Sequence, residues 1–172
     1  MKTINLIATI GFALVVAQQA NAQLATNSSN YSTAIGFRGG ETSGLTIKHF
    51  MGNQNALEGI VGLWYHGFSA TLLYERHSQA FNASGLNWYY GLGGHGTVYS
   101  SHRYYRYHGR HRHDHYHAGS VGVGVDGIFG LEYKIPKAPI ALSIDVKPYV
   151  EVISSGGIWT SLDPGVGIKV TF

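Results

Sequence analysis

The sequence predicts an all-β protein, an eight-stranded antiparallel up-and-down β-barrel, from three observations. Apolar and polar residues alternate along most of the chain after residue 30, which is the pattern of strands with two different faces. Turn signals rich in Gly, Asn, Ser and Pro interrupt this alternation at regular intervals. Only 12% of the 172 residues are charged, against roughly 25% in an ordinary soluble domain. So few charges indicate that much of the surface does not face water.

The first element is an export signal, expected over residues 1–22. A positively charged start and an apolar core precede Ala20-Asn21-Ala22, the small-x-small pattern of a cleavage site. The apolar run is shorter than the roughly 20 residues that a membrane-spanning helix needs, which favours cleavage over a permanent anchor. We therefore expect a short N-terminal segment over 23–30 after cleavage, and no transmembrane helix. The absence of Cys excludes disulfides and thiolate metal sites.

The barrel itself is expected over residues 31–172, with one strand between each pair of turn signals. The clearest alternations run from Ile140 to Val146 and from Val166 to Phe172, where every second residue is apolar. Most of the strands reach the roughly 9–11 residues that a tilted strand needs to cross a bilayer. In chain order the expected strands cover 31–39, 44–51, 56–65, 68–77, 86–100, 118–134, 140–152 and 164–172.

The character of the two faces separates a membrane barrel from a soluble one. The polar face carries mainly Gly, Ser, Ala and Thr with single charges, which suits the narrow interior of eight strands better than a surface in water. Aromatic residues gather near strand ends on the apolar face, as they do in membrane barrels. They are Phe37, Tyr65, Phe68, Tyr74, Trp88, Tyr133 and Phe172. These features favour a transmembrane β-barrel, and a soluble lipocalin-like binding barrel is the alternative.

The last strand carries a resemblance to exported barrels of Gram-negative bacteria. Its alternating residues Val166, Ile168, Val170 and Phe172 are similar to the signal that the barrel-assembly machinery reads. The segments "AIGFRGGETSGLTIKHF", "GLEYKIP" and "SIDVKP" resemble small outer-membrane β-barrel proteins of the Bacteroidota, most of which have no assigned function. The resemblance implies a location in the cell outer membrane, with its lipids and lipopolysaccharide as surroundings and the assembly machinery as a partner during biogenesis. It implies no catalytic positions.

The charged residues of the barrel fall on the polar face, which a membrane barrel turns inward. Each charge in a narrow lumen must be paired, because an unpaired buried charge costs several kcal/mol. We expect a structural ion-pair network that fills the lumen, since eight strands enclose no porin-sized channel. A polar conduction path or a catalytic carboxylate pair is the alternative. The expected lumen residues are Arg38, Lys48, Glu58, Glu75, His95, Asp126, Glu132, Asp145, Lys147, Glu151 and Lys169.

Residues 101–117, "SHRYYRYHGRHRHDHYH", carry the most unusual chemistry and the basic character of the chain. Counting strands makes this segment the third external loop, and it is also the longest. Alternate residues of an extended ribbon point to the same side, so the alternating histidines bring imidazoles together. Neutral imidazole suits Zn²⁺, Ni²⁺ and Cu²⁺. The candidate metal ligands are His108, His111, His113, His115 and His117.

The same loop allows other interpretations. Four interpretations stay open. The loop is a solvated polar segment without a specific ligand, or it is a weak divalent-metal site, or it contacts lipopolysaccharide phosphates. The fourth is a pH switch that gains charge as its histidines protonate. Phosphates suit its arginines because guanidinium binds them bidentately. The residues proposed for that contact are Arg103, Arg106, Arg110 and Arg112, with Tyr104, Tyr105 and Tyr107 at the membrane surface.

Two further patterns were considered for catalysis and cofactor binding. Glu75, His77 and Ser78 have the residue types of a lipid-modifying hydrolase, but Ser78 lies on the opposite face from the other two. The glycine-rich residues 91–96 lie within a strand and lack the strand–turn–helix context of a phosphate-binding loop. We therefore expect a non-catalytic structural or surface-interaction protein without a cofactor or a nucleic-acid partner. A lipid A deacylase-like enzyme is the alternative.

Overall fold

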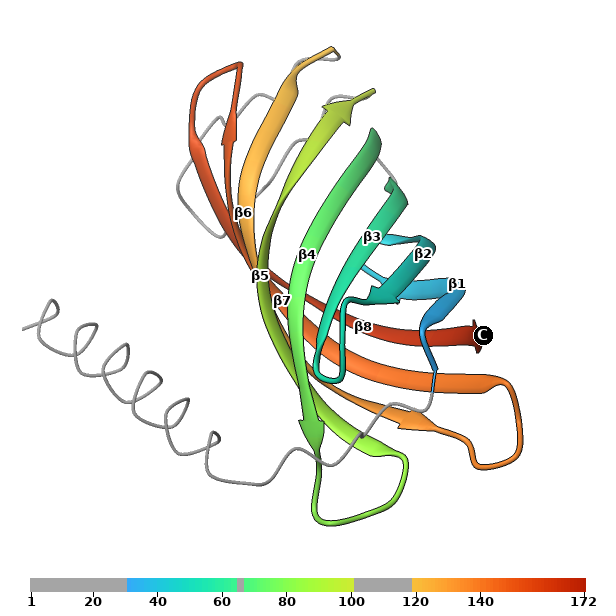
Figure 1. Cartoon of the computed structure of the whole chain (residues 1–172). Coiled ribbons are helices and arrows are strands. Elements are labelled where there is room, and N and C mark those ends of the chain that lie inside the picture. The colour runs from blue at the N-terminus through green and yellow to red at the C-terminus, as the bar shows by residue number, and fades with distance from the viewer. Residues whose placement is uncertain (1–30, 65–66, 101–118) are drawn as a thin grey trace, which may run out of the picture.

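The chain folds into a closed antiparallel β-barrel, described by a computed structural model over residues 31–64, 67–100 and 119–172 (Figure 1). Each strand pairs with its neighbours in sequence, and β1 closes the barrel on β8 through pairs such as Ile35 with Val170. The strands are β1 (Thr33–Gly40), β2 (Ser43–Phe50), β3 (Asn55–Trp64), β4 (Gly67–Gln79), β5 (Leu86–Tyr99), β6 (Val121–Lys134), β7 (Ile140–Ile153) and β8 (Ile158–Thr171). The predicted fold class, an all-β eight-stranded antiparallel barrel, is confirmed.

No helix in the described part of the chain is long and apolar enough to cross a membrane.

The strand boundaries differ from the expected ones mainly at β8. The turn expected over residues 154–163 is only four residues long, because β7 continues to Ile153 and β8 already begins at Ile158. Gly156 and Gly157 make this tight turn, with φ angles of 96° and 123° that favour glycine. The Asp163-Pro164 pair indicates a turn locally, but in the barrel Asp163 lies within β8 and points inward to buried cations.

The outward face of the barrel is apolar all the way round. Large apolar side chains from every strand are exposed on it, with Leu63, Leu92 and Ile158 each about three-quarters exposed, at 74%, 75% and 74%. In the described strands the only outward Lys, Arg, His, Asp or Glu side chains are His49 and Arg76, both near one end of the barrel. The outward surface therefore has the apolar composition of a protein core, and nearly all the charged side chains of the described strands point inward.

Aromatic side chains lie on this outward face near the strand ends. Phe37 and Phe68 lie toward one end of the barrel, and Tyr133 and Phe172 toward the other, all exposed. Trp88 stacks on Phe129 of the neighbouring strand at 5.5 Å between ring centroids. Tyr65, another residue of the expected aromatic set, lies outside the described residues.

The interior is filled by side chains, and apolar ones gather in two small groups. Tyr31, Phe50 and two alanines pack together at the end where the described chain begins, with Tyr31 and Phe50 in edge-to-face contact at 5.1 Å. Ile60, Leu73, Tyr89 and Ile128 form the second group. Most other buried side chains are polar or charged. The barrel is thus the inverse of a soluble domain, with apolar groups outside and charged groups inside.

Candidate functional site

The charged lumen is the most unusual site of the barrel. The structure places all the expected lumen residues on the inward face, and every one of the ten acidic, Lys and Arg side chains among them is buried. The His95 side chain is 6% exposed. Two further ionisable side chains, His77 and Asp163, lie in the lumen with no exposed surface. Every strand of the barrel contributes at least one of these residues.

One part of the network surrounds the ammonium group of Lys48 and is called the Lys48 cluster; its members are Lys48, Lys169, Glu58, Glu75 and Glu132. The Lys48 Nζ atom lies 2.8 Å from Glu75 Oε2, 2.9 Å from Glu58 Oε2 and 3.1 Å from Glu132 Oε2. The three carboxylates come from β3, β4 and β6, so one side chain of β2 links strands around the barrel. The same Nζ lies 4.4 Å from the centre of the Tyr89 ring.

Lys169 supplies the second cation of the Lys48 cluster. Its Nζ lies 2.8 Å from Glu58 Oε1 and 3.9 Å from Glu132 Oε2. Thr46 donates a short hydrogen bond to Glu58, and the Tyr31 hydroxyl donates one of 2.6 Å to Glu132 Oε1. Burial raises the pKa of this Tyr31 hydroxyl, and the negative charge of Glu132 raises it further. Each carboxylate is therefore held by more than one donor or cation.

His77 lies against the Lys48 cluster and is completely buried. Its Nε2 atom is 3.0 Å from Glu75 Oε2, and its ring stacks on Tyr89 at 5.2 Å and packs edge-on against Phe50 at 4.8 Å. Glu75 and His77 thus share the inward face, as expected, while Ser78 lies on the other face of β4. The pair has an imidazole and a carboxylate, but the Ser78 hydroxyl of the expected catalytic group does not lie beside them.

The other part of the network surrounds Arg38 and is called the Arg38 cluster; its members are Arg38, Lys147, His95, Asp126, Asp145, Glu151 and Asp163. The guanidinium of Arg38 contacts two carboxylates at once, with Nη2 2.6 Å from Asp145 Oδ1 and Nη1 3.0 Å from Asp163 Oδ2. It also donates to the backbone carbonyls of Thr42 and Asp163, both at 3.0 Å. Tyr89 donates to the second oxygen of Asp145 at 3.0 Å. A side chain at Gly165 would overlap the Arg38 guanidinium, so the glycine makes room for it.

Lys147 and His95 complete the Arg38 cluster. Lys147 Nζ lies 3.1 Å from Asp126 Oδ1 and 3.6 Å from Asp163 Oδ2. Both ring nitrogens of His95 face carboxylates, Nδ1 at 2.8 Å from Asp126 Oδ2 and Nε2 at 3.5 Å from Glu151 Oε1. A nitrogen that faces a carboxylate needs a hydrogen, and only the imidazolium carries one on both nitrogens. The geometry therefore fits a positively charged His95.

The charge balance of the lumen shows what a charged His95 contributes. The lumen holds seven carboxylates, from Glu58, Glu75, Asp126, Glu132, Asp145, Glu151 and Asp163, against four Lys and Arg side chains. Every one of those four cations has a carboxylate oxygen within 3.1 Å. A positively charged His95 reduces the remaining excess of negative charge from three to two. The described lumen is an ion-pair network that joins strands across the barrel.

Sequence reasoning missed two lumen residues for different reasons. The Asp163-Pro164 pair predicts a turn, although Trp159, Ser161 and Asp163 continue the inward positions of β8 and indicate a longer strand. His77 was weighed as part of a catalytic group, and its position two residues after Glu75 already places it on the same face of β4.

The metal-binding interpretation concerns a part of the chain outside the described residues. Residues 101–118 are not described, and they include His108, His111, His113, His115 and His117 as well as the arginines proposed for phosphate contact. Among the residues that are described, no group of three or more His, Cys, Asp or Glu side chains could hold a metal ion. The residues expected to form the assembly signal are all exposed on the outward face: Val166, Ile168, Val170 and Phe172.

The barrel was compared with known families, curated proteins and solved structures, and no family model, curated protein or solved structure matches it.

Proposed function

We propose that this protein is a non-catalytic β-barrel of the cell outer membrane with a structural or surface-interaction role. The observation that carries the proposal is the apolar outward face, to which every strand contributes exposed large apolar side chains. Exposed apolar patches on soluble monomers rarely exceed a few hundred Å², whereas a membrane barrel needs an apolar band around its whole circumference. Backbone groups in such a band must be satisfied internally, which a closed barrel achieves.

The interior supports the same proposal over a soluble binding barrel. A lipocalin-like barrel places apolar side chains inside, around a ligand cavity. Here the interior contains two ion-pair clusters, and a small internal space of about 10 Å³ lies beside His95 and Lys147. Such a space holds about one water molecule. A buried ion-pair network is suited to holding strands together.

In this proposal the N-terminal residues 1–22 direct export and are removed, and residues 101–117 form an external loop. The loop's arginines and histidines give it a chemistry suited to lipopolysaccharide phosphates or a divalent metal ion. Outer-membrane lipids surround the barrel, and the barrel-assembly machinery inserts it. With Ser78 on the other face of β4, the buried Glu75–His77 pair gives no support to a lipid A deacylase-like activity.

Fractionation of a Gram-negative host that expresses the full chain tests this proposal. We expect the protein in the outer-membrane fraction, beginning at Gln23, and migrating faster on an SDS gel before boiling than after it. Recovery in the soluble periplasmic fraction, without heat-modifiable migration, would contradict the membrane assignment. Calorimetric titration of Zn²⁺ or of lipopolysaccharide into the purified barrel, with and without residues 102–117, then tests the loop.

A further inference from the structure

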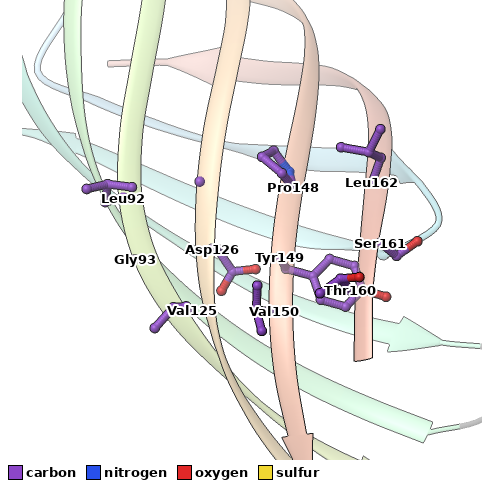
Figure 2. A pocket seen from close by; sticks show the side chains of 11 residues that line it. Leu92, Gly93, Val125, Asp126, Pro148, Tyr149, Val150, Thr160, Ser161 and Leu162 are labelled. Carbon is purple, nitrogen blue, oxygen red and sulfur yellow. The ribbon is translucent and has the colours of Figure 1, made fainter. Parts of the chain in front are cut away.

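The outward wall of the barrel carries a groove of about 670 Å³ over β5, β6, β7 and β8 (Figure 2). Its outward-pointing walls are the side chains of Leu92, Val125, Pro148, Val150, Thr160 and Leu162. Gly93 and Asp126, which also border it, lie near the middle of β5 and β6. On β8 the groove lies nearer the β7–β8 turn, since Thr160 is the third residue of that strand. Its volume lies in the roughly 300–1,000 Å³ range of small-molecule sites.

Two features of the wall create this groove. The outward position 127 of β6 is a glycine that borders the groove, so no side chain fills the wall there, and the exposed side chains of Leu92 and Val125 stand beside it. Of the glycine-rich residues 91–96, Leu92 and Gly93 line the groove. Glycine within a strand often marks the close approach of another group.

The second feature is a gap in the ladder between β6 and β7. Pairing stops after Asp126 with Tyr149 and resumes at Phe129 with Val146 in the same register. The unpaired stretch of β7 contains Pro148, which has no amide hydrogen to donate. Its ring lies close to Gly127, where an added Cβ would be 3.3 Å from Pro148 Cγ. At the base of the groove, Gly127 and Ile128 of β6 are therefore not paired in the ladder with Pro148 and Lys147 of β7.

We propose that the groove holds one acyl chain of a membrane lipid, an inference that rests on the membrane location proposed above. The outward lining is uncharged, and the part of the groove on β5 and β6 lies near the middle of these strands, where a spanning strand meets hydrocarbon and not head groups. An acyl chain that lies between the Leu92, Val125 and Leu162 side chains contacts the protein on several sides. An acyl chain against a smooth wall contacts the protein on one side only.

Photo-crosslinking with a phosphatidylcholine that carries a diazirine in the middle of one acyl chain tests the proposal. The full-length mature barrel is folded into vesicles that contain this lipid, floated on a density gradient, irradiated and mapped by mass spectrometry. The blocked variant is Val125→Trp, which fills the groove with a larger side chain. Val166→Trp is the matched control, because Val166 also points outward and is similarly exposed, 60% against 66% for Val125, but does not line the groove.

We expect cross-links to concentrate on groove residues such as Leu92 and Leu162, and to fall several-fold in Val125→Trp but not in Val166→Trp. Flotation with even labelling of outward residues around the barrel would overturn the acyl-chain site and leave the membrane assignment intact. Unchanged labelling at the groove in Val125→Trp would also overturn the acyl-chain site and leave the membrane assignment intact. A groove that a second copy of the chain covers, seen as cross-links to protein, would have the same consequence. Failure to float with vesicles would overturn both proposals.

Discussion

At the scale of single residues, Lys48 shows how the interior of the barrel is stabilised. Its ammonium group has three carboxylates within 3.1 Å and is completely buried. Bringing these charges out of water is costly, and the mutual attraction of the ions compensates that cost only while every partner is present. Loss of one central cation is therefore much more damaging than loss of a surface charge.

We expect Lys48→Met to lower the free energy of unfolding by about 3–5 kcal/mol, the usual cost of breaking a buried ion pair. The three carboxylates would then face one another without a shared cation. Urea unfolding of the barrel in lipid vesicles measures the change. Lys137→Met, in the exposed β6–β7 turn, is the control and should leave the unfolding midpoint unchanged. Equal midpoints for the two variants would contradict a stabilising role for the cluster.

His95 gives the lumen a dependence on pH. Both of its ring nitrogens face carboxylates, of Asp126 and Glu151, so the charged form makes two favourable contacts and the neutral form loses one of them. This stabilisation is present at low pH, where the imidazolium is populated, and is lost as the pH rises. We expect wild-type barrel stability to fall toward alkaline pH by more than that of His95→Gln. The control is His49→Gln, on the outward face, whose stability should depend on pH as that of the wild type does. The same pH dependence in the wild type and both variants would contradict a role for His95.

At the scale of elements, the β7–β8 hairpin is longer than its sequence indicates. The four-residue turn between Ile153 and Ile158 allows β8 to carry Asp163 into the lumen, where it contacts Arg38 and Lys147. The geometry of this turn depends on Gly157, whose φ of 123° is poorly tolerated by residues with a Cβ. A change in the turn therefore acts on the position of a lumen residue several positions away.

Gly157→Ala should destabilise the barrel by about 1–3 kcal/mol, because alanine at this φ is strained. The same unfolding assay in vesicles measures it. Gly96→Ala is a suitable comparison, since an added Cβ at Gly96 meets no atom within 4 Å. If both substitutions leave the unfolding midpoint unchanged, the hairpin is not constrained in the way we describe.

At the scale of the whole molecule, strand pairing closes the barrel and charged side chains fill its interior. Strand pairing runs without interruption from β1 to β8 and back to β1, except for the gap beside Pro148. Inside, the two clusters connect residues that lie far apart in sequence, such as Lys48 with Glu132 and Arg38 with Asp163. A lumen filled by ion pairs favours a rigid barrel over one that transports solutes.

We expect no single-channel currents from the wild-type barrel in planar bilayers, because side chains occupy the interior of an eight-stranded barrel. Arg38→Ala should lower thermal stability, since Asp145 and Asp163 lose their shared cation, and should still give no conductance. Discrete currents from the wild-type protein would refute the structural role of the lumen. Currents from Arg38→Ala alone would show that the guanidinium closes a path.

The sequence by itself determined the strands, the connections between them and the two faces of the barrel. The reason is geometric: alternate side chains of a strand point to opposite sides, so period-two alternation assigns Lys48 and Glu58 to the same compartment without knowledge of the fold. The tertiary structure decided which ions meet, because partners such as Arg38 and Asp163 are 125 residues apart and the stagger of the closed sheet sets their height. It also decided that Asp163 belongs to a strand and that the wall opens beside Pro148, since ion pairing and strand pairing across the barrel override local turn signals.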